Sequence, residues 1–299
     1  MNTHGLLFFL AYALVFAGVL IGMTWWDRRR RRTKHPLPEN FKLLRMPGES
    51  LWRQVIDRDE ADIQWFLGAL ILPLVAGGLV LQVLAWSFPS STTLVLVLAI
   101  SCFAFLLLLC VRFFQARLQR RADEYLGFIG ERYVAEWLDP LKAAGWFLFH
   151  DVPFDGATGK FNIDHVAVGP RGVWVVETKT YRKGKTKEGR KAHEVEFNGS
   201  KVIWPWWEDS DSVQQAIDSV RDLTNWLNTM TGKTYPVSAV LAIPGYSVIE
   251  RAIKPIRVTN PKLLPGVLTA PINPVLLKDD IDLIRRQLEA KCRDVELKP

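Results

Sequence analysis

Two acidic residues and a lysine flank a turn near the middle of this sequence. Asp164 begins one apolar run, Glu177 ends the next, and Lys179 follows two residues later. The turn sequence Gly169-Pro170-Arg171-Gly172 separates the two runs. Carboxylate oxygens bind Mg²⁺, and a lysine beside them stabilises negative charge in a transition state. The pattern is therefore typical of a metal site that hydrolyses phosphodiester bonds.

The turn decides whether the two carboxylates converge. Asp164 and Glu177 are equally far from the midpoint of the turn, so a loop with an even number of residues makes them cross-strand partners, with Cβ atoms about 5 Å apart. Pro170 cannot adopt the positive φ of a two-residue primed turn, so we expect a four-residue loop. A three-residue turn with a bulge would shift the pairing by one. Lys179 faces the same way as Glu177 in either case, because side chains two apart on a strand do so.

The strands that carry these groups are expected to be buried on both faces, because valines occupy most of their positions. Charged groups at the end of such a strand pair cost roughly several kcal/mol unless they are paired or bind a metal. An ion pair among the three groups meets this requirement as well as a metal does. Glu131 favours the metal, because Gly127 and Gly130 let its helix approach the sheet closely. Taken alone, Glu131 has the position of an ordinary solvated helix residue.

The surrounding sequence predicts a mixed sheet covered by helices. A helix from Arg112 to Trp137 is expected to end before Asp139-Pro140. Strands rich in β-branched and aromatic residues are expected at 146–152, 163–168, 173–178, 195–204, 237–243 and 256–259, and helices at 212–230 and 279–291.

Three apolar segments precede this region, at residues 5–24, 66–86 and 93–113, and each is near the ~20 residues that span a bilayer. The first lacks the features of a cleaved signal peptide and is followed by tryptophans and Arg28–Arg32, a stop-transfer pattern. Arginines also follow the third segment, which places both basic clusters in the cytoplasm and the N-terminus outside.

The expected organisation is a membrane region at 1–116 and a cytoplasmic domain at 117–299 with a C-terminal helical extension. The membrane helices are expected at about 5–26, 66–88 and 93–115, joined by a cytoplasmic loop at 27–64. An amphipathic helix in this loop, around Trp52 and Val55, is expected at the membrane interface.

The net charge of +7 is compatible with a nucleic-acid partner, although topology and anionic lipid explain the arginines beside the spans. Three cysteines, two of them in the third apolar segment, exclude a disulfide framework. Residues 182–191 contain six basic side chains and one acidic side chain, Glu188. The segment either contacts phosphates or forms a solvated hairpin tip. Trp204, Trp206 and Trp207 are expected in the core or as interface anchors rather than stacked on bases. His165 faces away from Asp164 and is expected to be structural, and no spacing supports a histidine metal ligand.

Three strings together resemble the NERD (nuclease-related domain) family of the PD-(D/E)XK nuclease superfamily. They are Gly130-Glu131-Arg132, the run Asp164-His165-Val166-Ala167-Val168-Gly169-Pro170-Arg171-Gly172, and Val175-Val176-Glu177-Thr178-Lys179. The resemblance covers roughly residues 123–260 and implies a restriction-endonuclease-like α/β (α+β) domain with a central mixed sheet flanked by helices.

The resemblance also implies roles for individual residues. Asp164 and Glu177 become ligands of Mg²⁺, with Mn²⁺ as the alternative metal, and Lys179 orients or polarises the attacking water. Glu131 becomes the acidic residue contributed by the helix. Gln215 matches the glutamine of the family's Asn-Pro-x-x-Gln element, but Asp211-Ser212 replace its Asn-Pro. Gln214 therefore remains an alternative to Gln215.

The resemblance and the apolar segments together predict a Mg²⁺-dependent nuclease in the bacterial inner membrane. Its partners would be the lipid bilayer and nucleic acid, with DNA favoured over RNA, and the oligomeric state is not indicated. One alternative is a catalytically inactive, membrane-tethered module of the same fold that binds nucleic acid or transmits a signal. A third is a structural membrane protein whose carboxylates only pair with lysine.

Overall fold

A computed structural model describes residues 12, 15–26, 42–88, 91–156, 159–271 and 275–296, which fall into two compact units. The first unit comprises Met1–Leu44 and Arg293–Pro299. Its described parts are a helix at Val15–Trp26 and strand β1 (Lys42–Leu44), which pairs antiparallel with β11 (Arg293–Glu296). The first predicted span is described only at residue 12 and from residue 15 onward. The basic cluster Arg28–Arg32 lies outside the described residues.

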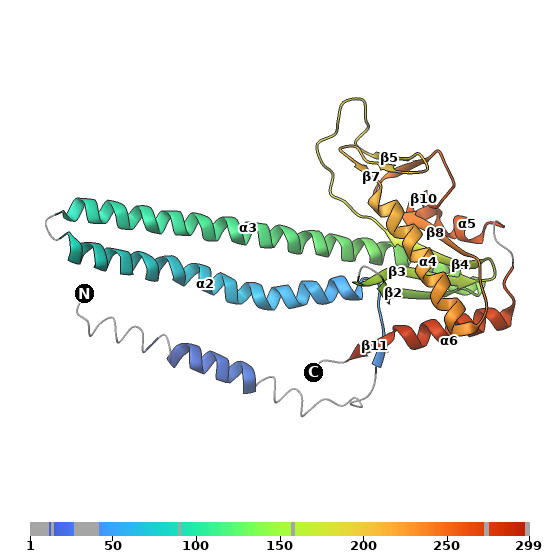
Figure 1. Ribbon diagram of the computed structural model, residues 1–299, viewed down its shortest axis with the longest axis horizontal. Helices are drawn as coiled ribbons and strands as arrows, with labels where there is room; N and C mark the ends of the chain where they lie inside the picture. The colour runs from blue at the N-terminus through green and yellow to red at the C-terminus, as the bar shows by residue number, and fades with distance from the viewer. Residues whose placement is uncertain are drawn as a thin grey trace. The chain divides into compact units, whose positions relative to one another are not determined.

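Two long helices lie side by side in the second unit, Arg45–Cys292 (Figure 1). Helix α2 covers Glu49–Ser87 and α3 covers Thr92–Leu138. Arginine–carboxylate pairs link the two helices: Arg58–Glu124 at 2.7 Å, Arg117–Asp62 at 2.6 Å, and Arg121–Asp59.

The helix expected around Trp52 and Val55, within the cytoplasmic loop at 27–64, is present, but it is continuous with the second apolar segment. Residues 49–64 belong to α2, the helix that also carries the second apolar segment, and residues 27–41 lie outside the described residues. No glycine or proline interrupts 49–64, and Asp59 and Asp62 of this stretch pair with arginines of α3. The predicted interfacial helix is therefore the beginning of α2.

One helical stretch among the described residues, Thr92–Ala144, is long and apolar enough to cross a membrane by length and composition. The apolar stretches Val15–Trp26 and Ile71–Ser87 are shorter. Helix α3 ends at Leu138, as Asp139-Pro140 predicted, and a 3₁₀ turn, η1 (Asp139–Ala144), follows it.

A five-stranded mixed sheet, in the order β10-β8-β4-β3-β2, forms the centre of the domain. β2, β3 and β4 are antiparallel neighbours, whereas β4, β8 and β10 run parallel. The strand bounds are Phe147–Gly156 (β2), Gly159–Gly169 (β3), Gly172–Thr178 (β4), Val237–Ala242 (β8) and Arg257–Thr259 (β10). An α+β fold with a mixed sheet flanked by helices is thus confirmed.

Helices cover both faces of this sheet. Val166 and Val175 belong to the larger apolar cluster, with residues of α4 (Asp211–Thr231) and α6 (Lys278–Cys292). Ala167 and Val176 belong to the other cluster, with the end of α3 and with α5 (Leu264–Thr269), which follows the 3₁₀ turn η2 (Pro261–Leu263). All seven residues of β4 are buried, as the run of valines predicted.

A smaller four-stranded sheet, in the order β7-β6-β5-β9, packs around aromatic side chains. Its strands are β5 (Glu194–Phe197), β6 (Val202–Ile203), β7 (Glu208–Asp209) and β9 (Ser247–Glu250). Trp204 has no exposed surface and contacts the rings of Tyr181 and Tyr246 at centroid distances of 4.9 and 5.3 Å. The predicted core position of Trp204 is confirmed, whereas Trp207 is 37% exposed.

Candidate active site

The hairpin between β3 and β4 has the even register that brings Asp164 opposite Glu177. Its last pair is Gly169 with Gly172, and the pairing continues without a shift to His165 with Val176. The next pair in this register is Asp164 with Glu177. Asp164 Oδ2 accepts a hydrogen bond from the Thr178 amide at 2.7 Å, which fixes the carboxylate at this level of the sheet.

The predicted four-residue loop is wrong, because only Pro170 and Arg171 lie between the last paired residues. Pro170 still cannot take a positive φ. Gly172 takes it instead, with a φ of 108°, and so closes the turn without changing the register.

Glu177 is held by two residues of α4. Its side chain has no exposed surface, and it accepts hydrogen bonds from Ser219 Oγ at 2.8 Å and Gln215 Nε2 at 3.2 Å. Gln215 Oε1 in turn accepts a hydrogen bond from Lys179 Nζ at 2.7 Å. A single amide therefore links the carboxylate to the lysine, and both face α4 as the spacing of the strand predicted.

Gln215, rather than Gln214, is the glutamine in contact with the other predicted site residues. Gln214 is exposed and donates to Asp218 at 3.2 Å within the same helix. Ser219 was not predicted, although it follows Gln215 by four residues and so lies on the same face of α4. That spacing is the signal in the sequence by which Ser219 was identifiable.

Glu131 lies on α3 with 6% of its surface exposed, so the solvated alternative is wrong. It accepts a hydrogen bond from the Gly48 backbone, and its Oε2 is buried without a hydrogen-bond partner among the described residues. Burial, followed by the nearby charge of Asp164, raises the pKa of Glu131 to about 10.

The pKa values of the two strand carboxylates, Asp164 and Glu177, are also raised. Burial raises the pKa of Asp164 to about 6, while the Lys179 charge and the Thr178 amide oppose this rise. Burial and the Asp164 charge raise the pKa of Glu177 to about 8. Two or three ionised carboxylates repel one another here, because Lys179 supplies only one positive charge.

A divalent cation fits this donor set. The described residues contain no group of three or more His, Cys, Asp or Glu side chains arranged to hold a metal, so a complete protein cage is not formed. Mg²⁺ rarely uses such a cage and binds through one or two carboxylates, with water and substrate phosphates completing its shell. Asp164 and Glu177 would hold the cation, and the unpartnered Oε2 of Glu131 offers a further oxygen.

The two histidines near the site form a separate pair, of which His165 is buried and His150 partly buried. His165 has no exposed surface, and its Nδ1 lies 2.9 Å from Nδ1 of His150 on β2. Burial lowers the pKa of both rings, that of His150 to about 4. Both are therefore neutral packing residues at neutral pH, which confirms the structural role predicted for His165.

Gly130 sets how closely α3 approaches the end of β4. A Cβ at this position would lie 1.9 Å from Thr180 Oγ1 and 2.8 Å from Thr180 Cβ. We expect Gly130→Ala to lower the unfolding temperature, with a loss of about 1–3 kcal/mol from overpacking, as measured by thermal unfolding in detergent. Gly266→Ala is the matched control, because its Cβ would meet nothing within 4 Å. Equal stability of the two variants would contradict the close approach.

Neither a curated protein nor a solved structure matches the chain. Residues 126–244 match a family model described as NERD, Nuclease-related domain. This range includes all five predicted site residues, Glu131, Asp164, Glu177, Lys179 and Gln215. The part of the chain that brings Glu177, Gln215 and Lys179 together is thus similar to the nuclease-related domain family.

Proposed function

We propose that this protein is a membrane-anchored, Mg²⁺-dependent nuclease with a PD-(D/E)XK-type site. The single observation that supports this most strongly is the chain of contacts from buried Glu177 through Gln215 to Lys179, inside the segment similar to the nuclease-related domain. A mere ion pair would bring lysine directly onto the carboxylate. Here, among the described contacts, Lys179 donates to Gln215, and Gln215 in turn donates to Glu177.

Each residue has a distinct part in this proposal. Asp164 and Glu177 bind the cation, and Glu131 offers a further oxygen from the helix side. Mg²⁺, or Mn²⁺ in its place, would supply Lewis-acid polarisation of the scissile phosphate. Lys179 orients the attacking water and stabilises the negative charge of the transition state, and Gln215 fixes the direction of the lysine.

The membrane anchor is the α2–α3 hairpin together with the apolar segment near the N-terminus. Many large apolar side chains of the hairpin are exposed, for example Leu74 at 61%, Trp86 at 88% and Ile100 at 64%. Exposed apolar surface of this extent is costly in water and suits lipid. We propose three spans in the bacterial inner membrane, with the N-terminus outside and the nuclease domain, residues 117–299, in the cytoplasm.

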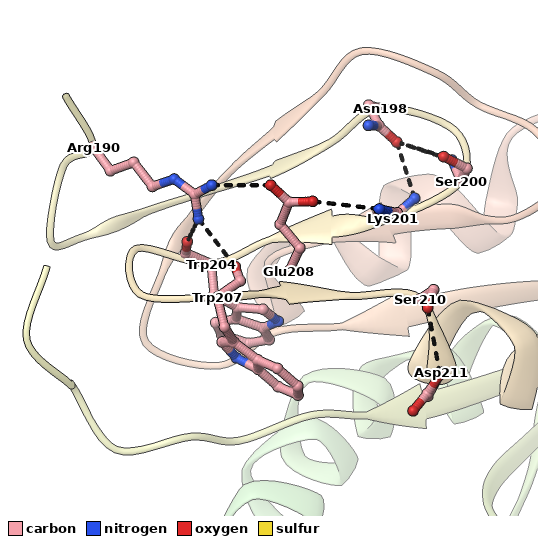
Figure 2. A network of polar contacts seen from close by, with 9 residues as sticks. All are labelled: Arg190, Asn198, Ser200, Lys201, Trp204, Trp207, Glu208, Ser210 and Asp211. Atoms are coloured by element: carbon pink, nitrogen blue, oxygen red, sulfur yellow. Dashed lines mark hydrogen bonds and ion pairs between the residues drawn. The ribbon is translucent and has the colours of Figure 1, made fainter. Parts of the chain in front are cut away.

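Residues 182–191 are proposed to contact the phosphates of the substrate, for which DNA is favoured over RNA. Lys183, Lys185 and Lys187 are exposed, and their side chains have no hydrogen bond or ion pair within the described part of the chain. The segment is nevertheless tied to the domain at both ends, and Arg182 pairs with Asp123 at 3.1 Å. Arg190 donates to the backbone oxygens of Trp204 and Trp207 at 2.6 and 3.1 Å and pairs with Glu208 (Figure 2).

Replacing these three lysines with alanine should weaken nucleic-acid binding and lower the slope of log affinity against log salt by up to about three. Fluorescence anisotropy of a labelled DNA across a salt series, with EDTA present, measures this without cleavage. The control variant replaces Lys160, Lys262 and Lys278, three exposed lysines elsewhere in the domain. An equal loss of nucleic-acid affinity in both triple variants would be explained by net charge alone. It would contradict a direct contact between residues 182–191 and the phosphates.

A nuclease assay of the full-length protein in detergent tests the function. We expect cleavage of DNA in the presence of Mg²⁺ or Mn²⁺ and none in EDTA. Single-stranded and double-stranded DNA and RNA substrates assayed in parallel identify the preferred nucleic acid. Binding of nucleic acid without cleavage under any metal condition would instead favour the inactive module of the same fold.

A further inference from the structure

A short segment that follows β1 and ends in the first turn of α2, Arg45–Ser50, contacts the candidate active site from a distant part of the sequence. The Gly48 backbone hydrogen-bonds Glu131 on α3. Arg45 and Ser50 bind Asp151 on β2, which is 2% exposed. The segment therefore contacts two buried carboxylates that lie about 80–100 residues later in the sequence.

The contacts to Asp151 saturate its carboxylate. Arg45 Nη1 lies 2.8 Å from Oδ2, the Ser50 amide donates to the same oxygen at 3.2 Å, and Ser50 Oγ donates to Oδ1 at 2.5 Å. Asn162 adds a hydrogen bond to Oδ1 at 3.2 Å. The arginine side chain is 13% exposed, so this pair is largely screened from water.

Asp151 is next to the proposed metal ligand Asp164. The pairs on either side are His150 with His165 and Val152 with Ile163, so the register of β2 and β3 brings Asp151 opposite Asp164. Among the described residues, Asp151 is also the non-glycine residue that has a positive φ, 49°. Its strained backbone needs outside support, and Arg45 gives part of it through a 2.9 Å hydrogen bond to the Asp151 carbonyl.

The segment is also fixed by close packing on α3. Gly48 has a φ of 71°, and a Cβ there would lie 2.7 Å from Phe128 Cδ2. Trp52 stacks on the same ring at a centroid distance of 5.1 Å. Because Phe128 precedes Glu131 by one helical turn, this packing determines where the Gly48 amide meets the Glu131 carboxyl.

We propose that Arg45–Ser50 is a positioning element of the active site: it orients Glu131 directly and Asp164 through Asp151. This inference rests on the proposed function, since it assigns the segment to that site. The element lies outside residues 126–244, includes the first two residues of α2 and precedes α3. A fragment that begins within α3 therefore lacks part of the site, even though it contains every residue proposed to touch the metal or the substrate.

The test compares Mn²⁺ binding by the full-length protein and its variants in detergent, measured by electron paramagnetic resonance of the free ion. Partners that orient ligand carboxylates typically contribute about 10–100-fold to metal affinity. We therefore expect Ser50→Ala and Arg45→Gln each to weaken Mn²⁺ binding about tenfold or more. Arg45→Lys keeps the charge beside Asp151 and should restore much of the affinity. Nucleic-acid affinity in EDTA should not change in any of them.

The matched control is Arg58→Gln. Arg58 is also on α2 and pairs with one carboxylate, Glu124 at 2.7 Å, but it makes no contact with Arg45–Ser50, Asp151 or Glu131 among those described. Absence of Mn²⁺ binding by the unmodified protein would overturn the proposed function itself. Binding by the unmodified protein with equal affinity in Ser50→Ala and Arg45→Gln would overturn the positioning role alone. An equal loss in Arg58→Gln, or no recovery in Arg45→Lys, would reduce the segment to a general structural part and also contradict the inference.

Discussion

Replacing Glu177 with alanine should abolish metal-dependent cleavage, with a loss on the order of 10³-fold or more in rate. Glu177 is proposed to hold the cation from the buried strand β4. This strand contains no other carboxylate that could take over the role. Lys179→Ala should cause a loss of similar size, because the charge that stabilises the transition state would disappear. Initial rates on a labelled DNA substrate with Mg²⁺ measure both effects.

Separate controls distinguish a chemical loss from unfolding. Glu177→Gln keeps the volume of the side chain and an acceptor for Ser219, so its fold should persist while activity is lost. Lys262→Ala removes an exposed lysine from another part of the domain and should leave the rate unchanged. Circular dichroism confirms the fold of each variant. Cleavage by Glu177→Ala and Lys179→Ala at the rate of the unmodified protein would eliminate the proposed site.

The local order of the site could be predicted from the sequence, because it depends on short-range rules. The even spacing around Gly169–Gly172 implied the register, and the spacing of Glu177 and Lys179 implied a common face. The loop length was wrong because the prediction assigned the positive φ to the turn residues. In the structure Gly172, the first residue of β4, has that conformation.

The long-range parts of the site could not be predicted in this way. Arg45, Gly48 and Ser50 meet Asp151 and Glu131 only because α2 packs along α3, and nothing in the spacing of these residues indicates that pairing. The smaller sheet was predicted only in part, as one strand at 195–204 where β5 and β6 lie, and β7 and β9 were missed for a related reason. Strands of two to four residues, such as β6 and β9, are stabilised by their neighbours rather than by a recognisable pattern of their own.

The membrane segments mark a further limit of sequence patterns. Apolar composition predicted three spans, yet among the described residues only Thr92–Ala144 is long and apolar enough by itself. Helix α2 contains an apolar half and a charged half without a break between them. A hydropathy pattern locates the apolar half but does not reveal that its helix continues as far as the active site.

Metal affinity should rise steeply with pH between 6 and 8. The pKa of Glu177 is raised to about 8 and that of Asp164 to about 6, so a cation must displace protons that these carboxyls hold below those values. Each displaced proton contributes about tenfold per pH unit, which predicts an increase on the order of 100-fold from Glu177 over this range. Mn²⁺ titrations at pH 6, 7 and 8 measure the increase, and calorimetry in buffers of different ionisation enthalpy measures the released protons.

The same shift has a consequence for stability in the absence of a cation. An unfolded chain releases the Glu177 proton near the ordinary pKa of 4.5, whereas the folded protein keeps it up to about 8. The folded state therefore binds more protons in this window, so the contribution of Glu177 to stability is present at low pH and falls as the pH rises. A cation bound at pH 8 should restore it, which thermal unfolding with and without Mg²⁺ detects.

Ser219→Ala tests the sign of this dependence. The Ser219 hydroxyl donates to Glu177 and lowers its pKa, so its removal should raise that pKa further and move the pH of half-maximal Mn²⁺ binding upward. Thr229→Ala is the matched control, because Thr229 is exposed on the same helix and bonds only the Asn225 carbonyl. A midpoint that moves downward in Ser219→Ala, or affinity that does not change between pH 6 and 8, would show that Glu177 is not the group whose proton the metal displaces.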